Sequence, residues 1–321
     1  MHTSKSALHK ALLELHVAIV LAGITGPLGR LISLPAEELV WYRLGLSLPL
    51  FVALSLWQQR PFPQLKRQEW AMLVLNGMLI GFHWICFFSS VKYANVSVAL
   101  VCFSTSSLFT ALLDPLVNRN GLRWRQVALS LLALAGIVVL FQFNVQYRLG
   151  IALGLLAAIL SALFTLLNEK PAQHIPARTL SMYELLFAWI ILSLIGPWYL
   201  HQHPFHWPGA ADWIYLLILS WLCTVLAFTL SLSALKHISP FTINLSYNLE
   251  PIYGILIAFV LFQENRTLHL SFYVGFACIL LSVVLQTLYT LHRHRLLRKQ
   301  AATDQPIVQA SSAFPSQEQI D

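Results

Sequence analysis

The sequence predicts an all-α integral membrane protein with ten transmembrane helices in two inverted five-helix repeats. Three observations predict this fold class: an apolar composition, apolar segments long enough to cross a bilayer, and a weak similarity between the two halves of the chain. Of the 321 residues, 57% are hydrophobic and 10% are charged, whereas charged residues make up about 25% of a soluble domain. A chain of this composition is expected to be surrounded by a lipid bilayer.

Apolar segments of the length that a transmembrane helix needs, about 20 residues, recur along the chain. Turn-forming residues such as Pro61-Phe62-Pro63 and Asn118 to Gly121 separate several of them. Glu14 interrupts the first segment and no small-residue cleavage site follows, so we expect a retained helix and not a signal peptide. The predicted spans are residues 8–30, 36–57, 69–91, 95–117, 124–142, 149–168, 180–200, 211–235, 239–262 and 268–291.

Lysine and arginine are distributed unevenly between the loops. With the N-terminus on the inner side and the spans alternating, fifteen of the twenty basic residues lie on the inner side and four on the outer side. This asymmetry follows the positive-inside rule and predicts an inner-membrane protein with both termini cytoplasmic. The net charge of +7 is therefore a feature of topology, and no nucleic-acid partner is expected.

The two halves of the chain can be aligned at offsets of 141 to 145 residues. Leu39–Arg43 aligns with Leu180–Glu184, and residues 123–140 resemble residues 268–285. Because each repeat holds an odd number of spans, the second repeat is expected to be inverted in the membrane. Inverted repeats are typical of secondary transporters, which hold their substrate near the bilayer midplane between the repeats. The predicted units are a first repeat over residues 1–145, a second over residues 146–291, and a basic, then disordered, cytoplasmic tail over residues 292–321.

The ninth span carries an unusual polar stretch, from Asn244 to Gly254. Glu250 lies near the middle of this span and is followed by Pro251. A carboxylate at that depth costs roughly 2.5–3.5 kcal/mol and therefore faces a cavity or a partner, and Pro251 leaves the carbonyl of Tyr247 without its helical donor. Asn244, Tyr247 and Glu250 lie on or beside one helix face and are predicted to line an interior pathway. A buried polar pair that only fixes helix packing is the alternative.

Three further charged residues lie within predicted spans and need partners: Arg43, Asp114 and Glu184. Arg43 and Glu184 hold equivalent positions in the two repeats and could pair with each other. Arg43 could instead bind the carboxylate or phosphate of a substrate, or pack against Asp114 or a loop at a helix end. Asp114 lies near the inner end of the fourth span, where a gate or a structural role is expected.

Polar and aromatic residues inside the spans are the other candidates for a cavity wall. His83 could be a hydrogen-bonded packing residue or a proton relay, and Trp84 and Trp221 could stack on a planar ligand or only pack. Ser104 and Thr105 could face a cavity or bond back to their own helix. The predicted cavity residues are His83, Trp84, Ser104, Thr105, Asn168, Trp221, Thr224, Asn244, Tyr247 and Glu250.

Motifs for metal binding and hydrolysis are weak or absent in the sequence. His201, His203 and His206 lie in a short loop rich in Pro and Trp, where a solvated loop is favoured over a metal site. The four cysteines lie in apolar spans without CxxC spacing, which indicates buried thiols. The sequence has no phosphate-binding G-x-x-x-x-G-K-[ST] loop and no H-E-x-x-H or G-x-S-x-G motif. No enzymatic activity, cofactor or metal is predicted.

Four stretches of the chain resemble the EamA family of the drug/metabolite transporter superfamily. These stretches are residues 81–100 (GFHWICFFSSVKYANVSVAL), 103–115 (FSTSSLFTALLDP), 220–224 (SWLCT) and 248–264 (NLEPIYGILIAFVLFQE). The resemblance covers about residues 8–291 and implies ten helices, carriage of small metabolites, often outward, and a central cavity. Asn118 to Gly121 departs from the family because it lacks the G-E pair common after the fourth helix, whereas Gln263-Glu264 keeps half of that pair.

The sequence as a whole predicts a secondary transporter, with export the expected direction, for small metabolites such as amino acids or related solutes. Alternating access would come from movement of the two repeats about a midplane cavity. The expected partners are a small-molecule substrate and the lipid bilayer, with proton coupling and the oligomeric state left open. The alternatives are a membrane-embedded enzyme that uses Glu250, Glu184 and His83 as acid and base groups, and a receptor that transports nothing.

Overall fold

The computed structural model describes residues 5–58, 65–118, 145–266 and 268–278, together with residues 135, 136, 139, 280, 281, 284, 285 and 288. All regular secondary structure in these residues is helical. The predicted all-α membrane fold is therefore confirmed for the described part of the chain. Within the described residues, six helices are long and apolar enough to cross a membrane: His9–Leu31, Arg67–Tyr93, Val96–Asn118, Arg148–Asn168, Ala177–Gln202 and Ala210–Ala234.

Most of the predicted spans coincide, within a few residues, with observed helices. Uninterrupted helices form the first three spans, the sixth and the seventh: α1 (Lys5–Leu31), α2 (Ala36–Gln58), α3 (Arg67–Tyr93), α7 (Arg148–Asn168) and α9 (Ala177–Gln202). The short helix α8 (Pro171–His174) lies between α7 and α9, and the 3-10 turn η1 (Val145–Tyr147) precedes α7. The fifth predicted span lies outside the described residues except at positions 135, 136 and 139, and the tenth is described as helical from Leu270 to Cys278 and at isolated positions beyond.

The fourth, eighth and ninth spans are interrupted helices. The fourth span consists of α4 (Val96–Phe103) and α5 (Ser106–Asn118). The eighth consists of α10 (Ala210–Ser220), the π-helical turn η2 (Trp221–Leu226) and α11 (Ala227–Ala234). The ninth consists of α12 (Pro240–Ser246), the 3-10 turn η3 (Tyr247–Leu249) and α13 (Glu250–Phe262). At membrane depth, an irregular backbone is tolerated only where protein or a cavity satisfies the released polar groups. The three interruptions therefore point to the interior of the bundle.

The residues at the interruptions explain why the helices break there. The hydroxyls of Ser104 and Thr105 donate to carbonyl oxygens three residues earlier, at 2.7 and 2.6 Å, and such local bonds compete with regular helix. The hydroxyl of Thr224 donates to the carbonyl five residues earlier at 2.7 Å, within the wide π turn. Pro251 has no N–H and begins a new helix in the favoured first turn.

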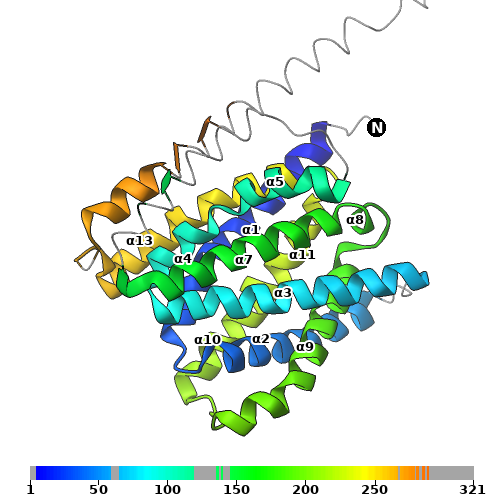
Figure 1. Cartoon of the computed structure of the whole chain (residues 1–321). Helices are drawn as coiled ribbons and strands as arrows, with labels where there is room; N and C mark the ends of the chain where they lie inside the picture. Colours follow the sequence, from blue (N-terminus) through cyan, green and yellow to red (C-terminus); the bar gives the residue numbers. More distant parts are fainter. Residues whose placement is uncertain are drawn as a thin grey trace, which may run out of the picture.

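Helices that are far apart in the sequence pack side by side. The long helix α3 packs against α7 and α9 (Figure 1). On the other side of the bundle, α1 packs against α11 and α13, and α2 packs against α9 and α10. Gly77 permits a close approach of α3 to α9, because a Cβ atom at this position would lie 2.7 Å from the carbonyl oxygen of Glu184. The first part of the chain is thus held mainly by contacts with the second part.

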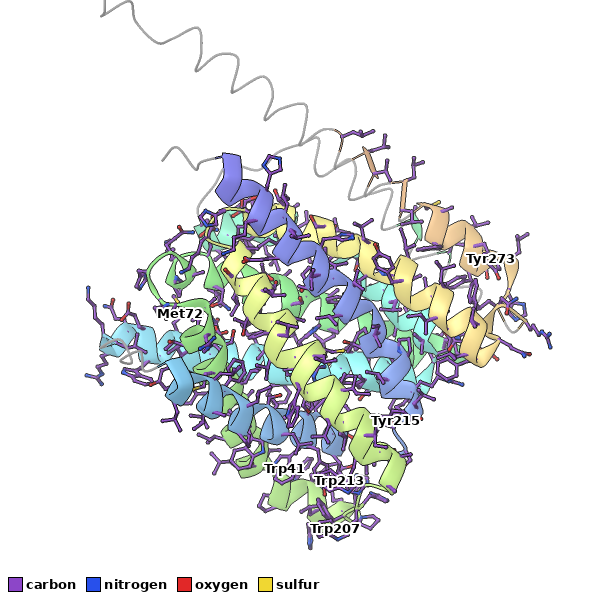
Figure 2. All side chains as sticks on the ribbon, turned by 180° about the vertical axis from the view of Figure 1, so that it is seen from behind. Trp41, Met72, Trp207, Trp213, Tyr215 and Tyr273 are labelled. Atoms are coloured by element: carbon purple, nitrogen blue, oxygen red, sulfur yellow. The ribbon has the colours of Figure 1, made fainter. Side chains whose placement is uncertain are left out.

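Aromatic side chains gather at the end of the bundle where α2 begins and α9 ends. Figure 2 shows Trp41, Trp207 and Trp213 in this region. The ring of Tyr42 joins the group, with centroids 5.2 Å from Trp41 and 5.7 Å from Trp213. Tryptophan and tyrosine are enriched where a membrane protein meets the membrane–water interface, so this end of the bundle is expected to lie at that interface.

The histidines of the loop after α9 make local contacts. His206 approaches the carboxylate of Glu38 through its backbone nitrogen at 3.0 Å and through Nδ1 at 3.1 Å. The ring of His203 lies 4.7 Å from that of Tyr199. These contacts hold the loop against the first turn of α2 and against the end of α9.

Candidate functional site

A cavity of about 110 Å³ lies inside the bundle, where the interrupted eighth and ninth spans meet α1, α2, α3 and α7. Five residues that the sequence analysis singled out line it: Arg43, His83, Trp84, Tyr247 and Glu250. Aromatic side chains and small hydroxyl groups complete much of the wall, among them Phe87, Phe103, Phe164, Phe228, Thr25, Ser161, Thr165 and Ser231. A few convergent polar groups in a mostly apolar wall are typical of small-molecule sites.

Arg43 is the buried cation of this cavity, with only 2% of its surface exposed. Its Nε donates to the hydroxyl of Thr224 at 2.6 Å, and its Nη2 donates to the carbonyl oxygen of Cys223 at 3.2 Å. The guanidinium also lies over the ring of Trp84, 3.9 Å from the ring centroid, which is a favourable cation–π contact. No group in the described part of the chain accepts a hydrogen bond from Nη1. The protein thus holds the guanidinium rigidly and leaves one charged donor unused.

Glu250 is the buried acid of the same cavity and is 3% exposed. It opens α13 directly after the 3-10 turn, so the break in the ninth span determines where its carboxyl group lies. Glu250 and Arg43 line the same cavity, but the two side chains make no direct ion pair among the described contacts. The space between them can therefore hold a ligand that carries both charges.

His83 makes the packing hydrogen bond that was one of the two roles considered for it from the sequence. Its Nδ1 lies 2.8 Å from the carbonyl oxygen of Ala157, so a neutral ring carries its proton on Nδ1 and keeps Nε2 as an acceptor. The ring centroid lies 5.2 Å from that of Phe103. His83 therefore ties α3 to α7 and also forms part of the cavity wall.

The other predicted cavity residues do not line this cavity. Ser104 and Thr105 bond back to their own helix, which is the alternative considered for them. Thr224 is buried behind Arg43 and supports the guanidinium. Trp221 is 45% exposed, and its Nε1 donates to the carbonyl oxygen of Leu46 at 3.2 Å. Asn168 is fully buried one turn beyond the cavity, whereas the side chain of Asn244 lies outside the described side chains.

Arg43 and Glu184 do not pair with each other in the structure. Glu184 is fully buried on α9, and its Oε1 accepts a hydrogen bond from Nδ2 of Asn76 at 2.9 Å. Glu184 is also absent from the lining of the cavity that contains Glu250 and His83. The three acid and base groups of the enzyme hypothesis are therefore not assembled around one space.

Asp114 lies at the end of α5, where it forms part of a polar junction with α7. The side-chain amide of Asn118 donates to Asp114 at 2.8 Å and to Glu169 at 3.1 Å. Burial raises the pKa of the Glu169 carboxyl group, and the neighbouring charge of Asp114 raises it further. Asp114 does not line the cavity that contains Arg43 and Glu250.

Two features of the site were missed from the sequence. One is the π-helical turn, which brings the carbonyl oxygen of Cys223 and the hydroxyl of Thr224 to Arg43. The other is Asn76, the partner of Glu184. A buried amide in an apolar span was a signal that could have identified Asn76, because polar groups at that depth need partners. No sequence signal identifies the π turn in advance.

A larger groove of about 460 Å³ lies between α2, α3 and α9. Its walls are mostly apolar, with exposed rings such as Trp198, and Glu37 and Glu38 lie at its margin. Glu38 is already bonded to His206. The smaller cavity has the buried opposite charges and the convergent polar groups, and it is therefore the candidate substrate site.

A helical membrane bundle with a charged cavity enclosed between its helices is the architecture of a membrane transporter. The EamA-like transporter family matches residues 9–142 and again residues 148–288, and the chain belongs to this family. It is a multi-pass membrane protein of the drug/metabolite transporter superfamily, as the resemblance of the sequence indicated.

Similar proteins carry the same general description. The chain is 24% identical over 245 residues to the uncharacterized transporter sll1164 of Synechocystis, which covers 71% of this chain and 68% of that protein. It is 23% identical over 230 residues to the uncharacterized transporter YetK of Bacillus subtilis, with 69% of each chain covered. A solved crystal structure that is 20% identical matches with a TM-score of 0.62 and covers 89% of this chain and 97% of that one, which supports the fold alone.

Proposed function

We propose that this protein is a secondary transporter that exports small zwitterionic metabolites, such as amino acids or related solutes. The single observation that carries this proposal is that a buried cation, Arg43, and a buried acid, Glu250, line one cavity without a direct ion pair. Aromatic side chains provide much of the remaining wall. A solute with a carboxylate, an amine and an apolar portion complements these three elements.

Arg43 is suited to hold the carboxylate of the substrate. Its Nη1 is a buried donor without a partner among the described residues, and an unsatisfied buried donor costs about 1–3 kcal/mol, or more when it is charged. A carboxylate placed in the cavity would accept from Nη1 and would neutralise the guanidinium. Thr224 and Trp84 already fix the orientation of the guanidinium, so little side-chain freedom is lost when the substrate binds.

Glu250 is suited to hold the amine of the substrate. An ammonium group beside this carboxyl would supply the counter-charge that a buried acid needs. The rings of Trp84, Phe103 and Phe164 would then surround the apolar portion. A purely anionic solute would neutralise Arg43 and leave Glu250 without a counter-charge, and a neutral sugar would pair with neither charge, so these classes fit the cavity less well.

The contacts between helices support a two-repeat architecture for the proposed transporter. Arg43 of the second span bonds to Thr224 of the eighth, and Glu184 of the seventh span bonds to Asn76 of the third. Helices that hold equivalent positions in the two halves thus each form a side-chain hydrogen bond with a helix of the opposite half. We infer ten helices in two inverted repeats, 1–145 and 146–291, with alternating access by relative movement of the halves. Both termini would be cytoplasmic in an inner membrane.

The experiment that tests this function is substrate exchange in liposomes. The purified full chain is reconstituted, and uptake of labelled amino acids is measured against an internal excess of the same compound. We expect exchange, with a preference for apolar or aromatic side chains. Arg43→Gln and Glu250→Gln should each lower exchange at limiting substrate by about tenfold to a hundredfold, because each removes one charge-assisted hydrogen bond.

Matched controls distinguish the effect of removing a charge in the cavity from the effect of removing a charge elsewhere in the protein. Arg266→Gln and Glu14→Gln change the same residue types outside the cavity, and both variants should exchange at the wild-type rate. Wild-type protein that exchanges no amino acid would rule out the proposed substrate class. Full exchange by Glu250→Gln with an unchanged pH profile would remove Glu250 from the site.

A further inference from the structure

A second group of buried polar side chains lies where α3, α7 and α9 meet. Its members are Asn76, Asn168 and Glu184, and each has no exposed surface. Asn76 donates to Oε1 of Glu184 at 2.9 Å, and Asn168 lies beside the same carboxyl group. None of the three lines the cavity that contains Arg43 and Glu250. We call this group the α9 acid cluster.

Several polar atoms of the α9 acid cluster lack hydrogen-bond partners within the part of the chain that the structure describes. They are Oε2 of Glu184, Oδ1 of Asn76 and both amide atoms of Asn168. Buried polar atoms are nearly always hydrogen-bonded, and each exception needs a physical explanation. Here the exceptions gather around one carboxyl group, which indicates that the cluster is completed by something that binds there.

No described basic group neutralises the carboxyl of Glu184. On the helices packed against it, Arg43 of α2 bonds to Thr224, and His83 of α3 bonds to the carbonyl of Ala157. At the ends of these helices, Glu69 contacts His174, Arg178 donates to the carbonyl of Leu54, and Arg148 lies in the first turn of α7, away from Asn168. An isolated buried carboxylate is too costly to keep, so the group is expected to bind a cation or a proton.

The α9 acid cluster is adjacent to the cavity along two helices. Asn76 precedes the cavity residue Ile80 by one turn of α3, and Asn168 follows the cavity residue Thr165 by about one turn of α7. The cluster therefore lies toward the ends where α3 begins, α7 ends and α9 begins. These ends are cytoplasmic in the proposed topology. A group bound at the cluster would lie between the substrate cavity and the cytoplasmic side.

We propose that the α9 acid cluster is a proton-binding site that couples proton movement to transport, with Glu184 as the group that carries the proton. A proton from hydronium forms an O–H bond at Oε2 and leaves water behind. The neutral acid then donates from Oε2 to Oδ1 of Asn168, while Asn76 continues to donate to Oε1. Release reverses these steps when the bundle opens to water near the cluster.

The coupling role depends on the proposed transport function, whereas proton binding itself does not. The first measurement is therefore independent of transport. Infrared difference spectra of the purified full chain are recorded between acidic and alkaline buffer, to detect the carbonyl band of a protonated buried carboxyl group. We expect Glu184→Gln to lose part of this band and Glu14→Gln to keep all of it. An undiminished band in Glu184→Gln would overturn the proposal.

The second measurement separates coupling from exchange in liposomes. We expect Glu184→Gln to keep substrate exchange but to lose the stimulation of net transport by a pH gradient. Glu184→Asp retains a carboxyl group and should keep both the band and the stimulation. If Glu184→Asp kept the infrared band but lost the stimulation, the residue would be only structural and the proposal would be overturned. Net transport by the wild type that is driven by a sodium gradient and does not respond to pH would also overturn it. Absence of all exchange by wild type would instead contradict the proposed function and leave the infrared result standing.

Discussion

Arg43 illustrates how a charge can be kept inside a membrane bundle. Its guanidinium is bonded to Thr224 and to the carbonyl of Cys223, and it is stacked on Trp84. None of these partners is an anion, so the protein solvates the charge without neutralising it. The counter-charge must come from Glu250 across the cavity or from a bound substrate. This difference between solvating and neutralising a charge explains why Arg43 can serve as a binding group.

The hydroxyl of Thr224 gives the first test at the scale of a single residue. Thr224→Val keeps the shape of the side chain but removes the acceptor that lies 2.6 Å from Arg43 Nε. We expect a rise in KM for exchange and a destabilisation of about 1–3 kcal/mol, because a buried charged donor loses its partner. Exchange kinetics and thermal unfolding in detergent measure the two effects.

Thr110→Val is the matched control for this test. Thr110 is equally buried and its hydroxyl donates to the carbonyl of Ser106 at 2.8 Å, but it does not line the cavity. This variant should exchange with an unchanged KM. Equal changes of KM in the two variants would mean that Thr224 acts through general packing and not through Arg43.

At the scale of elements, the turn after α13 fixes the beginning of α4. Glu264 is 3% exposed in the 3-10 turn η4 (Glu264–Arg266). Its carboxylate accepts from the backbone nitrogens of Val96 and Ser97 at 3.1 and 2.9 Å and from the Ser97 hydroxyl at 2.7 Å. Carboxylates at a helix N-terminus satisfy unpaired N–H groups and complement the helix dipole. The ninth span is thereby joined to the fourth.

Glu264→Gln should therefore lower stability by about 0.5–2 kcal/mol, the range found for loss of a helix cap. Thermal unfolding of the purified protein in detergent measures the change, and Glu14→Gln serves as the control because Glu14 contacts only Lys10, at 3.8 Å, among its described ion pairs. A Tm for Glu264→Gln equal to that of wild type would show that the cap contributes nothing.

The junction between α5 and α7 gives a test of pH dependence. The pKa of Glu169 is raised by burial and by the charge of Asp114, so the ionised carboxylate opposes folding at neutral pH. An acid with a raised folded pKa contributes its full stability below its unfolded pKa and loses that contribution as pH rises through the folded value. Glu169→Gln should raise Tm at neutral pH, and the gain should shrink as pH falls. A gain that is constant with pH would contradict this explanation.

At the scale of the whole molecule, the sequence predicted the helices well and the side-chain partners less well. Long apolar segments and turn residues located the described spans within a few residues, because bilayer thickness determines helix length. Glu250 was singled out for its cost in lipid, and the structure places it in the wall of the cavity. Arg43 was considered as a partner of Glu184, but the two lie in different environments. Which neighbouring helix each of these two side chains contacts depends on tertiary packing, and no local sequence pattern encodes that packing.

The hydroxyl groups illustrate the same limit of sequence reasoning. Ser104, Thr105 and Thr224 were all predicted to face the cavity, yet the first two break the helix locally and the third supports Arg43. A hydroxyl can bond to its own backbone or across a helix interface with similar energy. Only the tertiary structure determines which of these bonds forms.

The central claim is that the cavity beside Arg43 and Glu250 is a wet substrate site reached from either side of the membrane. Ser231 lines this cavity, so Ser231→Cys in a chain whose native cysteines are replaced by serine or alanine is the direct probe. We predict that a small water-soluble thiol reagent labels this cysteine from each side of the membrane in turn, and that a transported amino acid protects it. Labelling only by a lipid-soluble reagent, unaffected by any amino acid, would contradict the account.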